Sequence, residues 1–145
     1  MDLSILSWNI RGVRRSEKRR ALKSLICKVR PCIVFLQECK LEKISDFEIR
    51  KLWGCANMEF EYAPAVGSSG GILCMWNPNI LHVSERFSSR RYIALIGVHK
   101  QLGVDCGFVN VYGPSSNSKK VKFLEELLTF LNAKRIPWCL GGILT

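Results

Sequence analysis

A carboxylate follows a continuous apolar stretch of this 145-residue chain. Ile33-Val34-Phe35-Leu36 shows no polar alternation, as in a strand covered on both faces, and Glu38 comes two residues later. Two β-branched residues and the preceding Pro31 favour a strand over a helix for residues 32–38. A carboxylate at the end of such a strand lies where α/β folds bind their ligands. Glu38 is therefore the first candidate for chemistry; the alternative is a solvated side chain at a strand exit.

The second candidate feature is a block of basic residues between positions 11 and 30. Nine lysines and arginines lie there against one glutamate, so the segment carries a net charge of +8, while the whole chain carries +10. Such a density indicates a polyanionic partner, most simply a nucleic acid. The alternative is a solvated helix face. The nucleic-acid interpretation assigns phosphate contacts to Arg11, Arg14, Arg15, Arg19 and Arg20.

A β-α-β unit is predicted to position Glu38. Residues 3–8 are expected to form a strand, followed by a loop over residues 9–12. Ser16 is the expected N-cap of a helix that Pro31 stops. Its apolar stripe recurs at helical spacing: Leu22, Leu25, Ile26 and Val29. Strands joined in this way are expected to be parallel, with a right-handed crossover.

The middle of the chain predicts a second helix and then a change to β-structure. The helix is expected over residues 41–53, with Ile44, Phe47 and Leu52 inward and Gly54 at its end. Short β-rich runs separated by turn residues follow, at Phe60, Tyr62 and residues 71–76, 80–83, 92–99 and 104–112. Connections this short predict antiparallel neighbours.

The last part of the chain predicts a third helix and a final buried strand. Residues 113–117 offer caps for the helix, and residues 137–142 form the strand. The helix carries an apolar stripe that is expected to face the core: Phe123, Leu124, Leu127, Leu128 and Leu131.

Length and composition predict a single domain with a substantial core. The seven cysteines form neither a CxxC pair nor a zinc-finger spacing with histidine. With no secretory signal or membrane-spanning apolar run, they predict an intracellular protein of the nucleus or cytoplasm, without disulfides or a membrane partner. The two histidines, His82 and His99, are expected to be structural.

Four stretches taken together resemble the endonuclease/exonuclease/phosphatase superfamily, and most closely the endonuclease domains of plant LINE-type retrotransposons. They occur in the family's order and at similar spacing: Ser7-Trp8-Asn9-Ile10-Arg11-Gly12, Phe35-Leu36-Gln37-Glu38-Cys39-Lys40, Ser69-Gly70-Gly71-Ile72-Leu73-Cys74-Met75-Trp76 and Asn110-Val111-Tyr112-Gly113-Pro114. The resemblance implies an α/β (α+β) fold, a four-layer α-β-β-α sandwich of two mixed sheets flanked by helices. Residues 1–145 would form the amino-terminal part of such a domain, incomplete at the carboxyl end.

The resemblance also implies roles for individual residues. Glu38 matches a ligand of Mg²⁺, and Asn9 matches a residue that helps to hold the metal site. Tyr112 matches a residue that touches the scissile phosphate, and Asn110 supports the floor of the same site. The alternatives are that Asn9 only caps a turn and that Tyr112 is a half-buried strand aromatic.

The chain departs from the family pattern at the next motif, Gly-Gly-Asp-Phe-Asn. Gly141 and Gly142 align with its glycines, but Ile143 stands where the catalytic Asp belongs and Thr145 where an Asn stabilises the phosphate. The Ser-Asp-His signature that supplies the acid–base pair is absent. An isoleucine cannot accept a proton, so we expect no hydrolysis and weak or no Mg²⁺ binding by this chain.

These observations leave three functional interpretations. The chain is a Mg²⁺-dependent DNA endonuclease (phosphodiesterase) by resemblance, inactive because the catalytic Asp, Asn and His are missing. Alternatively, it is a non-catalytic basic module that binds nucleic acid, DNA rather than RNA, or a retroelement-derived fragment without function. A truncated sandwich is also expected to have open strand edges and uncovered apolar faces.

Overall fold

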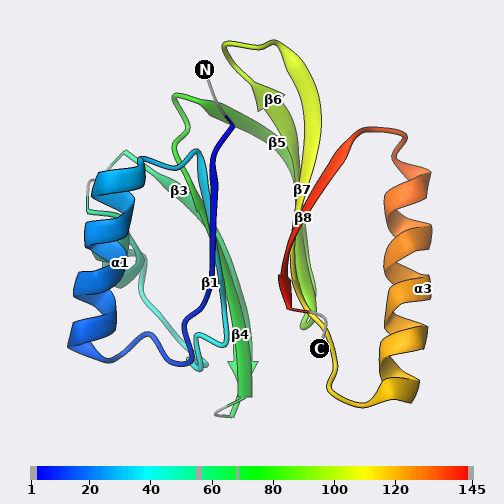
Figure 1. Ribbon diagram of the computed structural model, residues 1–145, viewed down its shortest axis with the longest axis horizontal. Helices are drawn as coiled ribbons and strands as arrows, with labels where there is room; N and C mark the ends of the chain where they lie inside the picture. The colour runs from blue at the N-terminus through cyan, green and yellow to red at the C-terminus, as the bar shows by residue number, and fades with distance from the viewer. Residues whose placement is uncertain (1–2, 55–56, 68, 144–145) are drawn as a thin grey trace.

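Two β-sheets pack face to face in the computed structural model, which describes residues 3–54, 57–67 and 69–143, and helices cover both outer faces (Figure 1). Each sheet has four strands and mixes parallel with antiparallel pairs. The expected α-β-β-α sandwich is therefore confirmed.

The first sheet has the strand order β1-β2-β4-β3. Its strands are β1 (Ile5–Asn9), β2 (Ile33–Gln37), β4 (Ser69–Trp76) and β3 (Glu59–Val66). The helix α1 (Ser16–Val29) joins β1 to β2 in parallel, as predicted, and sets Asn9 opposite Gln37. Every residue of β2 is buried, as its apolar sequence predicts.

The second sheet has the strand order β5-β6-β7-β8. Its strands are β5 (Leu81–Ser88), β6 (Tyr92–His99), β7 (Val104–Tyr112) and β8 (Trp138–Ile143). The first three form the predicted antiparallel series, and β6 and β7 have the predicted bounds. The helix α3 (Asn117–Ala133) then returns the chain so that β8 runs parallel to β7, with Tyr112 opposite Ile143.

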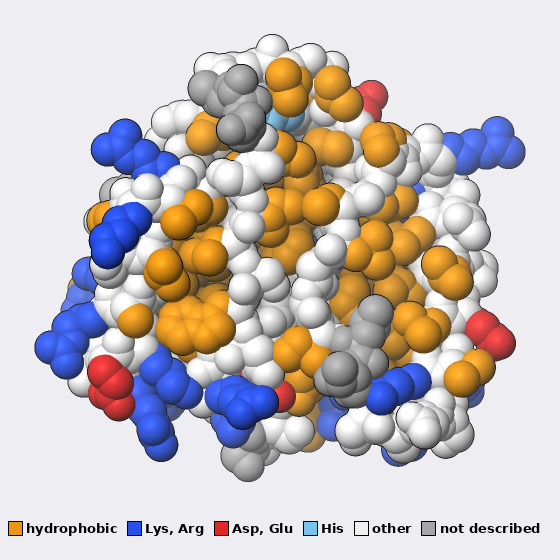
Figure 2. All heavy atoms as spheres, in the orientation of Figure 1, with side chains coloured by type: hydrophobic (Ala, Val, Ile, Leu, Met, Phe, Trp, Pro, Cys, Tyr) orange, Lys and Arg blue, Asp and Glu red, His pale blue; other side chains and the backbone are white. Residues whose placement is uncertain are grey.

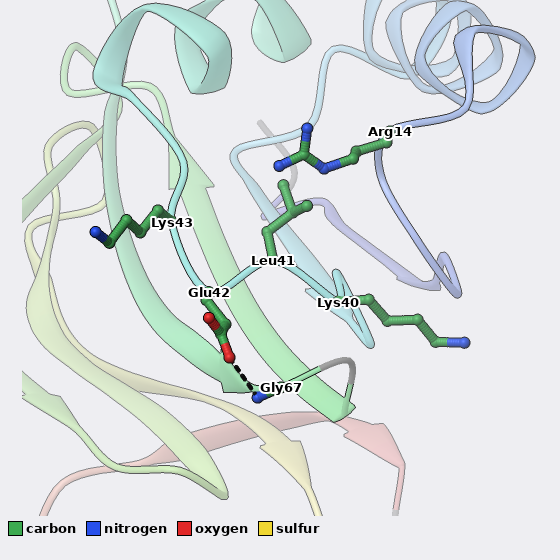
Figure 3. A pocket seen from close by; sticks show the side chains of 6 residues that line it. All are labelled: Arg14, Lys40, Leu41, Glu42, Lys43 and Gly67. Atoms are coloured by element: carbon green, nitrogen blue, oxygen red, sulfur yellow. Dashed lines mark hydrogen bonds between the residues drawn. The ribbon is translucent and has the colours of Figure 1, made fainter.

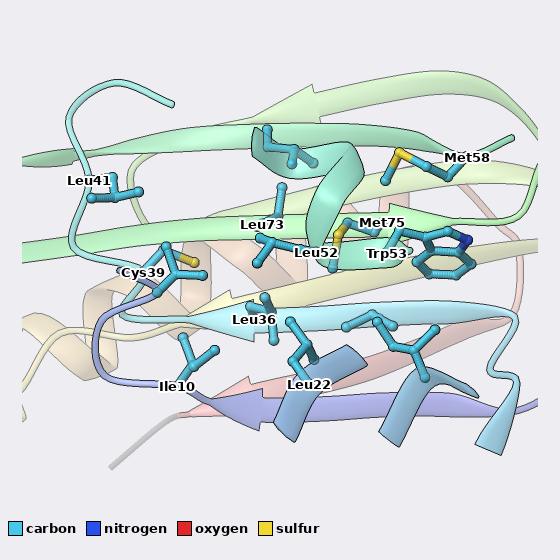
Figure 4. Close-up of a cluster of buried hydrophobic side chains, with 14 residues drawn as sticks. Ile10, Leu22, Leu36, Cys39, Leu41, Leu52, Trp53, Met58, Leu73 and Met75 are labelled. Carbon is cyan, nitrogen blue, oxygen red and sulfur yellow. The ribbon is translucent and has the colours of Figure 1, made fainter. Parts of the chain in front are cut away.

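Apolar side chains fill three layers of this sandwich. Phe35, Trp76 and Phe108 lie in the cluster between the two sheets, where Gly141 leaves room for the Phe35 ring. A second cluster lies between the first sheet and the helices α1 and α2 (Asp46–Trp53) (Figure 4). A smaller one lies beneath α3.

Helix starts differ from the sequence expectations. The helix α2 begins at Asp46 rather than near residue 41, because Ser45 caps it by accepting a hydrogen bond from the Glu48 N–H at 3.1 Å. As a result, Phe47 points to solvent and is 67% exposed, so its predicted inward position is wrong. The expected N-cap Ser16 lies inside α1, and Arg15 occupies the cap position.

The apolar stripes are also less buried than expected. Leu25 and Val29 of α1 are exposed, and so are Leu124 and Leu128 of α3. The strand β8, expected to be buried, is only half-buried because it lies at the outer end of its sheet. Each helix therefore packs only part of its apolar face against the sheets.

A buried amide ties the two sheets together. Asn110 of β7 donates hydrogen bonds to the carbonyls of Leu36 (3.2 Å) and Leu73 (3.0 Å) in the first sheet. It accepts one from the Nε2 of Gln37 at 2.8 Å. Asn110 and Gln37 are both buried and cannot bond to solvent water, so these hydrogen bonds satisfy their polar groups instead. The amide therefore fixes the sheets relative to each other directly below the ends of β2 and β7.

Gly142 provides a test of how closely β7 and β8 pack. A Cβ at this position would lie 2.0 Å from the Val111 carbonyl oxygen, and its φ is 112°. Gly103 also has a positive φ, of 63°, but a Cβ there would meet nothing within 4 Å. We expect Gly142→Ala to lower the free energy of unfolding by about 3 kcal/mol or more, and Gly103→Ala by about 1 kcal/mol. Urea unfolding measures the free energy of unfolding of both variants. Equal decreases would contradict the close contact between β7 and β8 at Gly142.

Candidate functional site

Three polar side chains meet where β1, β2 and β7 end. The Tyr112 hydroxyl donates a hydrogen bond to Oε1 of Glu38 at 3.0 Å, and the Asn9 Nδ2 approaches the same oxygen at 3.5 Å. Asn9 ends β1 and Glu38 directly follows β2, both of the first sheet, while Tyr112 ends β7 of the second. The structure therefore brings together three of the four residues that the resemblance implied, and Asn110 lies at the floor below them.

The backbone turns Glu38 toward this site. Gln37 points between the sheets to Asn110, so an extended Glu38 would point to the opposite face. Instead Glu38 has a φ of 53°, in the left-handed region that a non-glycine residue rarely adopts. The Glu38 carbonyl accepts a hydrogen bond from the Gly12 N–H at 2.7 Å. The Cys39 N–H donates to Gly71 at 2.9 Å. These bonds hold the unusual conformation, which is a typical feature of functional sites.

The environment of Tyr112 keeps its hydroxyl protonated. Burial raises the pKa of Tyr112, and the hydrogen bond to Glu38 and the carboxylate charge raise it further. The positive charges of Arg91 and Arg11 act in the opposite direction. Tyr112 is therefore a hydrogen-bond donor at neutral pH, and two arginines lie close enough to affect it.

The donor atoms fit a hard divalent cation. The Asn9 amide turns its Nδ2 toward the Glu38 carboxylate, and its Oδ1 is buried without a hydrogen-bond partner among the described residues. An amide and a carboxylate oxygen are ligands that Mg²⁺ accepts, and Mg²⁺ commonly takes one or two protein ligands with water and phosphate in its other positions. Among the described residues no group of three or more His, Cys, Asp or Glu side chains forms a metal site. Glu38 and Asn9 would thus supply only part of the coordination of a metal ion.

The site lacks a proton acceptor at the position where the resemblance expects one. Ile143 pairs with Tyr112 in the β7–β8 register, so both side chains project from the same face of the sheet. Thr145, the other expected departure, lies outside the described residues. The histidines do not compensate: His82 is exposed on β5, and His99 lies at the opposite end of the second sheet from Tyr112.

The sequence interpretation missed two polar residues beneath the site. Gln37 donates to Asn110 and also to the Oγ of Ser7 at 3.3 Å. The signal for Gln37 was its position, since it is a polar residue that ends a fully buried strand. Ser7 gave no such signal, because only the β1–β2 pairing sets it beside this network.

The basic residues of the amino-terminal segment separate into two groups. Arg11, Arg14, Arg15 and Arg20 are exposed. Arg19 instead donates from Nε to the Val13 carbonyl at 2.7 Å and pairs with Glu48 at 3.7 Å, so it also holds the loop after β1.

Two shallow hollows with basic linings flank the site. Arg14, Lys40 and Lys43 line one of about 440 Å³, in which the Glu42 carboxylate accepts a hydrogen bond from the Gly67 N–H (Figure 3). The other, of about 260 Å³, is lined by basic residues of the β5–β6 connection and of α3: Arg91, Lys119 and Lys122. Figure 2 shows Lys and Arg side chains on both sides of the lower edge of the molecule, where β1 ends in Figure 1.

Burial leaves the cysteines near the core unreactive. Burial raises the pKa of Cys39, next to Glu38, to about 12 and that of Cys32 to about 11. The six described cysteines are free thiols.

No helix in the described part of the chain has both the length and the apolar character needed to cross a membrane.

The chain is similar to known proteins in structure and not in sequence. No protein-family model matches the sequence, and no curated protein sequence is significantly similar to it. Solved structures match nearly the whole chain, and the three described below share 14–19% of its residues.

Three of these structures illustrate the likeness. An endonuclease/exonuclease/phosphatase family protein from Bacteroides thetaiotaomicron has a TM-score of 0.73 at 14% identity, over 98% of this chain and 63% of its own. The human Nocturnin catalytic domain with bound sulfate has 0.70 at 15%, over 98% and 63%. D. rerio TDP2 with a single-strand DNA product has 0.67 at 19%, over 98% and 60%.

The chain thus spans less than two thirds of the length of the structures that it matches. At these identities the likeness establishes the fold and not the activity. The chain has the fold of the endonuclease/exonuclease/phosphatase proteins.

Proposed function

We propose that this chain binds a divalent metal ion weakly, together with a phosphate group of a nucleic acid, at Asn9, Glu38 and Tyr112, and that it does not hydrolyse the phosphodiester. The observation that carries the proposal is the Glu38 carboxylate, held by Tyr112 beside the Asn9 amide, whose buried Oδ1 has no partner within the described chain. A pair of oxygens kept in this way suits a cation such as Mg²⁺.

Each residue of the site has a role that follows from its chemistry. Glu38 and Asn9 would hold the metal ion, which would supply positive charge to a phosphate oxygen. Tyr112 orients the Glu38 carboxylate by donating its one hydroxyl proton to Oε1, and its raised pKa keeps this hydroxyl protonated. Arg11 and Arg91 add positive charge around the tyrosine and attract an anion to the same point.

Hydrolysis needs a further group that activates water, and Ile143 cannot provide it. An aliphatic side chain neither accepts a proton nor orients a water molecule beside Tyr112. General acid–base help typically contributes about 10²–10⁴-fold to such reactions. The arrangement therefore favours binding without turnover.

The exposed basic residues make a nucleic acid the most suitable anion. They lie on both sides of the site, and a chain of phosphates can contact several of them at once. Nocturnin with its sulfate and TDP2 with its single-strand DNA product share this fold, and the motif resemblance to LINE endonucleases favours DNA over RNA. A second candidate function is metal-independent binding of nucleic acid by Arg11, Arg14, Arg15 and Arg20 alone.

Titration with Mn²⁺, a spectroscopic substitute for Mg²⁺, tests the metal site. We expect Glu38→Gln to weaken Mn²⁺ binding at least about tenfold, because it removes the charged ligand. Glu42→Gln is the matched control: this carboxylate lies four residues away and bonds the Gly67 N–H outside the site. Electron paramagnetic resonance of free Mn²⁺ measures both variants, and equal affinity of wild type and Glu38→Gln would refute the proposed ligand.

A plasmid-nicking assay tests the lack of turnover. The purified chain with Mg²⁺ or Mn²⁺ is expected to leave supercoiled and abasic DNA uncut, since Ile143 supplies no base. Metal-dependent nicking that disappears in Glu38→Gln would show that the chain is catalytic.

The salt dependence of DNA binding distinguishes the two candidate functions. We expect the DNA association constant to fall steeply as the salt concentration rises. The slope of its logarithm against the logarithm of the salt concentration should decrease in magnitude by about 0.9 for each phosphate of duplex DNA that a variant no longer neutralises. Arg14→Ser combined with Arg15→Ser and Arg20→Ser should reduce the slope, while Lys100→Ser, at the opposite end of the second sheet, should not. Fluorescence anisotropy with and without Mn²⁺ measures these slopes. DNA affinity that is identical with and without Mn²⁺ supports the metal-independent function.

A further inference from the structure

The turn that follows β2 has an unfavourable backbone conformation at two positions. Glu38 has a φ of 53° and Lys40 a φ of 61°, both in the left-handed region that residues with a side chain rarely adopt. Such conformations persist only where the surrounding structure holds them in place. The contacts of the residues after Glu38 therefore help to decide where its carboxylate lies.

Two buried side chains anchor this turn to the core. Cys39 and Leu41 are almost fully buried, with exposed fractions of 1% and 3%. Both belong to the cluster between the first sheet and its helices, and Figure 4 shows them on the segment that follows β2. Leu41 is thus a fixed point of the chain only three residues after Glu38.

Tyr62 of β3 binds the backbone of the turn at Leu41. Its hydroxyl donates a hydrogen bond to the Leu41 carbonyl, which also accepts one from the Ala65 N–H at 3.0 Å. Tyr62 is half-buried and packs against the same cluster as Leu41. Burial raises the pKa of Tyr62 to about 12, so the hydroxyl is a hydrogen-bond donor at neutral pH.

Gly71 of β4 leaves the room that the Tyr62 hydroxyl needs. A Cβ on Gly71 would lie 3.0 Å from the Tyr62 oxygen and 3.1 Å from the Lys40 nitrogen. The Gly71 carbonyl accepts a hydrogen bond from the Cys39 N–H at 2.9 Å. The Gly70 carbonyl accepts one from the Lys40 N–H at 2.8 Å. The strand β4 therefore binds the turn through its backbone, and the absence of a side chain at Gly71 allows Tyr62 to reach it.

We infer that Tyr62 is a positioning residue, which holds the turn through the Leu41 carbonyl and so keeps Glu38 directed at the candidate site. Among the described residues Tyr62 has no hydrogen bond to Glu38, Asn9 or Tyr112, so it acts through the turn and not on a bound ion. The consequence for metal binding rests on the proposed function, whereas the effect on the turn does not.

Amide hydrogen exchange of Tyr62→Phe tests the inference without a metal ion. The variant removes the hydroxyl and keeps the ring in the core. We expect the amides of Gly12, Cys39 and Lys40 to exchange about fivefold faster, while the amides of β2 are unchanged. Gly12 is the most informative of the three. Its N–H bonds the Glu38 carbonyl from the loop after β1, to which Tyr62 has no hydrogen bond within the described chain.

Tyr92→Phe is the matched control for the loss of a hydroxyl. Tyr92 is also a half-buried strand tyrosine, but it lies in the second sheet, where its ring contacts Phe123 and Phe130 of α3. We expect this variant to leave the exchange of the three amides in and beside the turn unchanged.

A second pair of variants tests the space at Gly71. Gly71→Ala places a Cβ against the Tyr62 oxygen and the Lys40 nitrogen, whereas a Cβ at Gly70 would meet nothing within 4 Å. Their φ values are 91° and 82°, so alanine strains the backbone similarly at both positions. We expect the Lys40 amide to exchange faster in Gly71→Ala than in Gly70→Ala. Adding Tyr62→Phe to Gly71→Ala should increase exchange by less than it does in the wild-type chain, because the crowded hydroxyl is then absent.

Titration with Mn²⁺ connects the turn to the site. Tyr62→Phe is expected to weaken Mn²⁺ binding about fivefold and Tyr92→Phe to leave it unchanged. A wild-type chain that binds no Mn²⁺ would contradict the proposed function, and exchange of the Gly12 amide would then decide the inference by itself.

Three results would overturn the inference. The first is equal exchange of the Gly12 amide in Tyr62→Phe and Tyr92→Phe. The second is faster exchange throughout β2 in Tyr62→Phe, which would show a general loss of stability instead of a local release of the turn. The third is faster exchange at Gly12 with unchanged Mn²⁺ affinity, which would show that the turn does not position the carboxylate.

Discussion

The separation of the two sheets is the constraint on which the candidate site depends. Glu38 belongs to one sheet and Tyr112 to the other, so their 3.0 Å hydrogen bond exists only while the sheets keep a fixed position. The buried Asn110 amide provides that position through bonds to two carbonyls and to Gln37. Directional polar bonds in an apolar interior are costly to break, so they fix relative position more sharply than apolar packing does.

The site combines oxygen ligands at its centre with positive charge at its rim. In the proposed function the oxygens of Asn9 and Glu38 would attract a cation, while Arg11, Arg91 and the lysines of the two hollows would attract an anion. Such an arrangement favours a metal ion and a phosphate together over either one alone, because each reduces the unfavourable charge that the other meets. The proposed lack of hydrolysis rests on the uncharged Ile143, which pairs with Tyr112.

Local sequence pattern was sufficient for the elements whose residues are uniformly buried. The strands β2, β6 and β7 follow their apolar runs closely, and the β-α-β unit follows from one helix between two strands. The pattern failed where exposure differs from hydrophobicity: β5 continues to Ser88 through exposed polar residues, and Phe47 is apolar but solvated. The Gln37–Asn110 contact joins residues 73 positions apart, so no local sequence pattern could predict it.

Each sheet is formed by one continuous segment of the chain, the first by residues 5–76 and the second by residues 81–143. None of the described strands passes from one sheet to the other, so each half can complete its own pairing before the halves meet. The contacts between Glu38 and Tyr112, and between Gln37 and Asn110, then form only at the docking step. The candidate site is in this sense a product of assembly within one chain: an intermediate with both sheets formed but undocked would contain every site residue and no site.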